Sequence, residues 1–163
     1  MSDRCKTGPK TLILGIGNTL LRDEGAGVHA IRMLAERVAG RDDIELMDGG
    51  TLSFTLAGAI EDAQQLIVID AAQLGGEPGT TRVFEGEQMD AFVGGNRKCS
   101  VHEVSLVDLL MIARLADHLP QRRALIGIQP HDIDWGEQPS PSVANAIPQA
   151  CHHALQLIEA WQT

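Results

Sequence analysis

The stretch of sequence that decides the fold is residues 11–27, TLILGIGNTLLRDEGAG. It opens with an apolar run, which predicts a buried strand. Three residues that tolerate unusual backbone angles predict a tight loop after it: Gly15, Gly17 and Asn18. The carboxylates of Asp23 and Glu24 follow, and the segment after them has helical periodicity. The expected apolar face of that helix consists of Val28, Ile31, Leu34, Ala35 and Val38.

Composition limits the classes of protein and partner. The 163 residues predict one domain, residues 1–163, with residues 1–10 as a polar tail. A net charge of -9 disfavours nucleic acids and anionic membranes as partners, and no apolar run is long enough to span a membrane. The odd, widely spaced cysteines Cys5, Cys99 and Cys151 suit reduced thiols and a cytoplasmic location.

Strand and helix patterns alternate along the chain, which predicts an α/β three-layer sandwich. A mainly parallel, twisted sheet of about five strands would lie between helices. Beyond the first strand, strands are expected at residues 44–47, 65–69, 80–84 and 124–128, with 65–69 the most clearly buried and 80–84 at an edge. Further helices are expected at residues 53–62, near Glu87, after a capping box at residues 100–103, and at the C-terminus, where Pro148 should kink or restart the helix. The helix after the capping box is expected to carry the apolar residues Val104, Val107, Leu110 and Met111.

Acidic residues follow each of the first three predicted strands. They are Asp23 and Glu24, then Asp48, then Asp70. Ligands of parallel sheets gather at this edge, where the strands end. Each acid also has a structural interpretation: Asp23 suits a helix cap, and Asp48 before two glycines suits a turn. Asp70 directly follows the most buried strand, where an unpaired charge would be costly. A functional role is therefore the favoured interpretation of Asp70.

His102 is predicted in the first turn of a helix, where the helix dipole keeps an imidazole neutral. Together with Glu24 and Asp70 it would supply one nitrogen and two carboxylates, a set that suits zinc or nickel. Alone, His102 is more simply explained by surface placement. Two further residues, His131 and Asp132, follow the last strand at the same edge and are candidates to touch the site.

Other motifs are weaker. Gly15 and Gly17 begin a dinucleotide-binding pattern, but Leu20 replaces its third glycine and acids stand at the helix entrance, which argues against a nucleotide-dependent oxidoreductase. Cys99 near His102 lacks an oxyanion element, so a free thiol is the simpler interpretation than a nucleophile. The other histidines, His29, His152 and His153, are expected on polar helix faces.

Several motifs, in order along most of the chain, resemble those of the hydrogenase maturation endopeptidases. They are GIGNTLLRDEGAG at residues 15–27, MDGGT at 47–51, VIDAAQLGGEPGT at 68–80, SVHEVSL at 100–106 and GIQP at 127–130. Residues 94–99 and the stretch around Trp135 match the family pattern less well. These departures leave open which hydrogenase subunit is recognised.

The resemblance implies a protease that removes a C-terminal extension from the large subunit of a nickel-iron hydrogenase after nickel insertion. The family's metal-binding positions fall on Glu24, Asp70 and His102. Its cleavage-associated aspartate falls on Asp48, so Asp48 and Asp70 are the candidate catalytic residues. The implied metal is nickel carried by the precursor, with zinc or cadmium as substitutes in vitro. Metal-assisted and aspartic-type cleavage both remain open, and a non-proteolytic nickel-binding escort is the alternative function.

Overall fold

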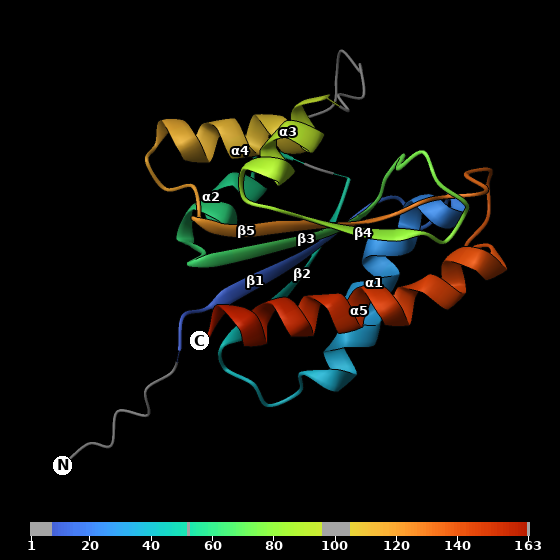
Figure 1. Cartoon of the computed structure of the whole chain (residues 1–163), viewed down its shortest axis with the longest axis horizontal. Coiled ribbons are helices and arrows are strands. Elements are labelled where there is room, and N and C mark those ends of the chain that lie inside the picture. The colour runs from blue at the N-terminus through green and yellow to red at the C-terminus, as the bar shows by residue number, and fades with distance from the viewer. Residues whose placement is uncertain (1–7, 52, 96–104, 163) are drawn as a thin grey trace.

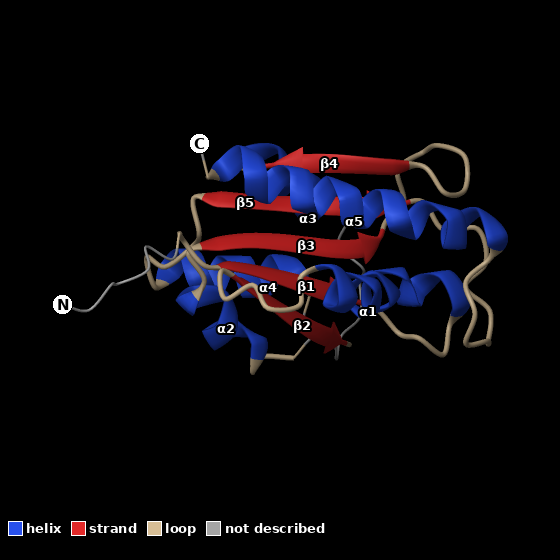
Figure 2. Cartoon of the chain, turned by 90° about the horizontal axis from the view of Figure 1, so that it is seen from below, coloured by secondary structure: helices blue, strands red, loops and turns tan. Residues whose placement is uncertain are grey.

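A five-stranded sheet forms the centre of the computed structural model, which describes residues 8–51, 53–95 and 105–162. The strands are β1 (Thr11–Ile16), β2 (Ile44–Gly50), β3 (Gln65–Ala71), β4 (Thr81–Glu85) and β5 (Arg122–Ile128). Their spatial order is β2-β1-β3-β5-β4, and only the edge strand β4 runs antiparallel to its neighbour (Figure 2). The predicted mainly parallel sheet is confirmed.

Helices cover both faces of the sheet, which makes the three layers visible in Figure 1. One face carries α2 (Leu56–Asp62), α3 (Glu87–Gly95) and α4 (Leu106–Leu115), and the other carries α1 (Ala26–Arg37) and α5 (Pro141–Trp161). A short 3-10 helix, η1 (Arg22–Gly25), joins the loop after β1 to α1. No helix among the described residues is both long and apolar enough to cross a membrane.

The core consists of two apolar layers, one on each face of the sheet. Residues 66–69 of β3 are fully buried, as expected for the central strand. On α1, Ala30 is buried and Ala35 is exposed, so the predicted apolar face was wrong at Ala35. On α4, Leu109 is buried, whereas Met111 is 49% exposed and faces away from the core. In both helices the buried face is rotated slightly about the helix axis from the predicted one. Successive residues are about 100° apart around that axis, so a small rotation changes which of two adjacent side chains is buried.

Two helices have features that the sequence did not predict. Helix α4 begins at Leu106, where Ser105 and Asp108 form a reciprocal capping box. The capping box predicted at residues 100–103, and the helical placement of His102 and Val104, lie outside the described residues. Helix α5 continues through Pro148 as one helix, so it does not restart there.

Candidate active site

The register of the sheet brings the ends of β2, β1 and β3 into one row. Gly15 of β1 pairs with Asp48 on one side and with Ile69 on the other. Asp70 follows Ile69 and pairs with Gly127 of β5. Since neighbouring strands are about 4.8 Å apart, Asp48 and Asp70 start from backbone positions roughly 10 Å apart, on either side of β1. The predicted convergence of strand ends at one edge is therefore present for these two acids.

Glu24 lies in η1, at the same edge, and close backbone packing fixes its position. Gly17 has φ 139°, and a side chain there would collide with the backbone carbonyl of Glu24. A side chain at Gly27 would likewise collide with the carbonyl of Ile69 on β3. The Glu24 N–H donates to the carbonyl of Leu21 at 3.0 Å. The short glycine-rich segment thus holds Glu24 against the ends of β1 and β3.

Of the three residues that were expected to adopt unusual backbone angles after β1, only one does so. Gly17 adopts a left-handed backbone, but Gly15 and Asn18 do not. Gly15 is required for contact instead, because a side chain there would overlap the backbone of Gly27. Asn18 accepts a hydrogen bond from the N–H of Leu20 at 2.9 Å, which is an Asx turn.

Asp23 is not the helix cap that the sequence suggested. The N-cap of α1 is Gly25, without a side-chain cap, and the Asp23 side chain is fully buried. Its Oδ2 accepts from the backbone N–H groups of His131 and Asp132, both at 2.8 Å. Ser140 donates its N–H to Oδ1 at 2.6 Å and its hydroxyl to Oδ2 at 2.8 Å. Asp23 therefore binds η1 to the segment between β5 and α5.

Asp23 keeps its negative charge in this position. Burial by itself raises the pKa of the Asp23 carboxyl, because it disfavours the charged form. The hydrogen bonds donated by Asp132, His131 and Ser140 outweigh burial and hold that pKa below its ordinary value. Sequence reasoning missed this role because the donors are more than 100 residues away.

Asp48 forms the turn that its two following glycines suggested. The side chain is exposed, and its Oδ1 accepts from the N–H of Gly50 at 2.9 Å. Gly50 has φ 50°, and its carbonyl accepts from the N–H of Gly17 at 2.9 Å. This turn joins the end of β2 to the loop that precedes η1. The structural interpretation of Asp48 is supported, and its catalytic role remains a prediction.

Asp70 is half-buried near the end of β3, and a buried glutamine anchors the loop that follows it. Gln129, just beyond β5, accepts from the Leu74 N–H at 2.6 Å and donates to the Gln73 side chain at 2.9 Å. The Ala72 N–H also donates to the carbonyl of Ile128 at 2.9 Å. The end of β3 is thus held in place by the residues that follow β5.

His102, the third residue of the predicted metal set, lies outside the described residues, as does Cys99. Within residues 8–51, 53–95 and 105–162, no three histidine, cysteine or acidic side chains are grouped to hold a metal. Glu24 in η1 and Asp70 near the end of β3 lie at the same edge of the sheet, and each has an interaction partner. The meeting of all three residues stays a prediction.

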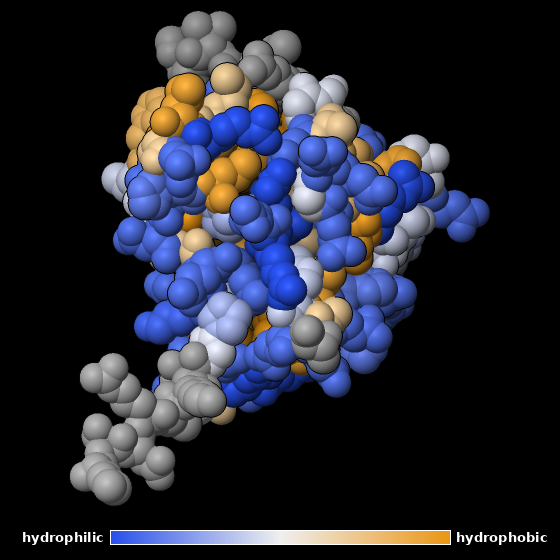
Figure 3. All heavy atoms as spheres, turned by 60° about the vertical axis from the view of Figure 1, so that its left-hand side comes forward, coloured by the Kyte–Doolittle hydropathy of each residue, from blue (hydrophilic) through white to orange (hydrophobic). Residues whose placement is uncertain are grey.

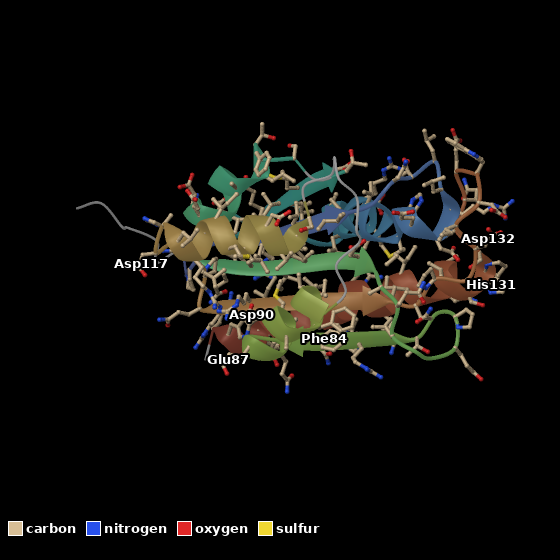
Figure 4. All side chains as sticks on the ribbon, turned by 90° about the horizontal axis from the view of Figure 1, so that it is seen from above. Phe84, Glu87, Asp90, Asp117, His131 and Asp132 are labelled. Atoms are coloured by element: carbon tan, nitrogen blue, oxygen red, sulfur yellow. The ribbon has the colours of Figure 1, made fainter. Side chains whose placement is uncertain are left out.

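His131 and Asp132 lie beside η1 at this edge. They line a pocket of about 470 Å³ that also includes Arg22 and Ser140. Arg22 forms an ion pair with Asp132 at 3.1 Å. Figure 4 places both labelled residues, His131 and Asp132, at one end of the molecule, away from Glu87 and Asp90. The predicted proximity of this segment to η1 is therefore observed, through backbone contacts with Asp23.

His29 differs from the prediction of a polar helix face. It is half-buried on α1, and its Nε2 atom is buried without a hydrogen-bond partner among the described residues. Burial lowers the pKa of His29, the positive charge of Arg32 lowers it further, and a hydrogen bond with the Glu137 backbone opposes both. The ring is therefore neutral at physiological pH and packs under the segment that Asp23 holds.

Comparison with known proteins identifies the family. The family model for hydrogenase maturation proteases matches residues 28–157. This chain belongs to the hydrogenase maturation protease family. The protease is 37% identical over 154 residues to the hydrogenase expression/formation protein HupD of Rhizobium leguminosarum bv. viciae, covering 94% of this chain and 76% of that protein. It is 31% identical over 147 residues to the hydrogenase 2 maturation protease of Escherichia coli (strain K12), covering 90% and 88%.

The solved structures agree with this assignment. The hydrogenase maturating endopeptidase HybD from Escherichia coli superimposes on the maturation protease with a TM-score of 0.85 and 30% identity, over 93% of each chain. The α/β fold and the peptidase class expected from the sequence are therefore confirmed. Which atoms perform the cleavage is a separate question.

Proposed function

We propose that this maturation protease removes the C-terminal extension of a nickel-iron hydrogenase large-subunit precursor and uses the nickel in that precursor to recognise it. Glu24, Asp70 and His102 would bind the nickel, which is part of the substrate. We also place the reaction in the cytoplasm. Reduced thiols suit that compartment, and Cys151, which is free and buried, is consistent with it.

The observation that carries the proposal is the position of Glu24 and Asp70. Close glycine packing holds η1 against the ends of β1 and β3, so a buried framework places one carboxylate beside the strand end that bears the other. Carboxylates are suitable ligands for a divalent ion, and a partial ligand set leaves positions free for the groups that already bind the ion in the precursor. Recognition of this kind makes cleavage depend on nickel insertion.

Two chemical routes to cleavage fit the edge of the sheet. The bound precursor is held with its scissile peptide near the ion, which can polarise the carbonyl or a water molecule. Asp48 is the candidate general base, and its exposure leaves one carboxylate oxygen accessible while the other accepts from Gly50. Asp70 is the candidate for a direct catalytic role if cleavage is of the aspartic type.

A processing assay tests the proposal. Nickel-loaded and nickel-free precursors are incubated with the wild type and with Glu24→Gln, Asp70→Asn and His102→Ala, and the mass of the large subunit is measured. We expect the wild type to shorten only the loaded precursor, and each variant to lose at least about 100-fold in kcat/KM. Asp90→Asn, on the opposite end of the sheet, is the control and should retain activity.

Equal processing of both precursors, or full activity in the three variants, would reject nickel recognition. An escort without protease activity would bind the loaded precursor and leave its mass unchanged. For Asp48→Asn we expect normal precursor binding and slow single-turnover cleavage. Weak binding with a normal cleavage rate would contradict the role of Asp48 as a base.

A further inference from the structure

The two neighbouring acids of η1, Asp23 and Glu24, have different surroundings. Asp23 is fully buried and accepts four hydrogen bonds, whereas Glu24 is half-buried at the edge of the sheet. A carboxylate offers about four lone-pair sites. Three donors occupy Oδ2 and one occupies Oδ1, and the side chain is fully buried by the segment between β5 and α5, so an ion could reach Asp23 only if that segment were displaced.

That segment and η1 are also joined along the backbone. The Asp23 N–H donates to the carbonyl of Asp132 at 3.0 Å, and the Arg22 N–H donates to that of Gly136 at 2.8 Å. The Gly136 N–H in turn donates to the carbonyl of Leu20 at 2.8 Å. These contacts leave η1 little freedom on this side.

Glu24 is held from the other side by glycine. Its carbonyl packs directly against Gly17, so movement in that direction is blocked by the end of β1. Arg22, two residues earlier, has φ 43°, an unfavourable angle for a residue with a side chain. Surrounding contacts must maintain such a conformation. The buried Asp23 carboxylate and the ion pair of Arg22 with Asp132 supply such contacts, and hydrogen bonds to a charged group are stronger than neutral ones.

From this geometry we propose that Asp23 is a positioning residue for the maturation reaction. It fixes the backbone of η1 so that Glu24 is presented at the sheet edge, and it takes no part in binding the metal itself. The proposal rests on the role of Glu24 in the proposed function. It assigns a purpose to the first acid of the DEG motif that neither a helix cap nor a metal ligand would have.

The test compares two aspartates that each join distant segments. In Asp23→Asn the four donors face an amide N–H₂ group or an uncharged oxygen that accepts hydrogen bonds more weakly. Asp90→Asn disrupts a similar junction far from Glu24. We expect the KM for nickel-loaded precursor to rise about 10-fold to 100-fold in Asp23→Asn, with kcat within about threefold of the wild type. Asp90→Asn should leave both unchanged at a temperature where all three proteins are folded.

Amide hydrogen exchange supplies a readout that is independent of activity. In Asp23→Asn, exchange should accelerate at His131, Asp132 and Glu24 and stay unchanged in β3. In Asp90→Asn these amides should exchange as in the wild type. If Asp23→Asn cannot be purified folded, Ser140→Ala removes only the hydroxyl donor, and the KM should rise on the order of 2-fold to 10-fold, as for loss of one hydrogen bond.

Wild-type KM and exchange in a folded Asp23→Asn variant, or equal effects in Asp90→Asn, would overturn the positioning role. In Ser140→Ala an unchanged KM would do the same. Failure of the proposed function has a different signature, because Glu24→Gln would then process loaded precursor normally. Loss of activity in Glu24→Gln with normal behaviour of Asp23→Asn rejects the positioning role alone.

Discussion

Both ends of the sheet use an aspartate to join segments that are distant in sequence, but the two aspartates have opposite surroundings. Near the start of β5, Asp90 accepts hydrogen bonds from Arg123 and Arg114, so its charge is cancelled by guanidinium groups. At the carboxyl ends of the strands, Asp23 accepts from neutral N–H and O–H groups. In the segment between β5 and α5, Asp132 forms an ion pair with Arg22 of η1.

Asp23 and Asp90 differ in whether a positively charged side chain neutralises the carboxylate. Neutral donors stabilise the Asp23 carboxylate without supplying a positive charge, so this junction keeps its negative charge. At the other end, shown towards the viewer in Figure 3, hydrophilic residues cover most of the surface, and hydrophobic ones show mainly at the upper left and along the right side. A carboxylate that keeps its negative charge favours a nearby cation, whereas one paired with guanidinium groups does not.

The largest expected effect tests the close packing that places Glu24. Gly27→Ala would press a methyl group into the backbone of Ile69 and Ile16, so the free energy of unfolding should fall by about 3 kcal/mol or more. Gly58→Ala, at an open position on α2, is the matched control and should raise stability by about 0.5–1 kcal/mol. Urea denaturation measures both. A similar response to the two substitutions would mean that packing at the carboxyl edge is loose.

Asp23→Asn comes next and tests whether its charge matters. At pH 7 we expect a loss of about 2–3 kcal/mol, because donors to a charged group lose their partner. The folded-state pKa of Asp23 lies below its ordinary value of 3.8, so its stabilisation is present above that value and is lost as pH falls through the lowered pKa. Denaturation from pH 7 down to about pH 3 should therefore show a shallower acid decline in Asp23→Asn than in the wild type. Parallel declines would contradict a charged Asp23.

Asp90→Asn should cost less, about 1–2 kcal/mol, since the side chain of Asp90 is 24% exposed and that of Arg114 is 63% exposed. The salt dependence of the stability loss should also differ between the two variants. High sodium chloride should reduce the difference between Asp90→Asn and the wild type, because it screens partly exposed ion pairs. The effect of Asp23→Asn should persist, since its donors are neutral and its carboxylate is fully buried. Equal salt sensitivity at both sites would remove the distinction between the two ends.

The smallest effect is expected for Trp135→Ala. Trp135 is 77% exposed in the segment that Asp23 holds, so its removal should change the free energy of unfolding by less than about 0.5 kcal/mol. Thermal unfolding in parallel with Asp23→Asn measures this. A loss as large as that of Asp23→Asn would show that the segment is held by its apolar side chains.

The sequence by itself determined the layers, the succession of strands and helices along the chain, and the edge at which the acids gather. Those features follow from hydrophobic periodicity and from glycine, which act over a few residues and can be recognised locally. Helix phase was the weak point, as Ala35 and Met111 show, because neighbouring helices decide which of two adjacent positions is buried.

Only the tertiary structure decided what the individual acids do. Asp23 has the local sequence of a cap, yet its partners are His131, Asp132 and Ser140, which are brought to it by the β5–α5 connection. Likewise Gly15 is needed for the approach of Gly27, and its backbone angle is ordinary. Hydrogen bonds and close contacts of this kind depend on distance in space, and folding alone brings together residues more than 100 positions apart.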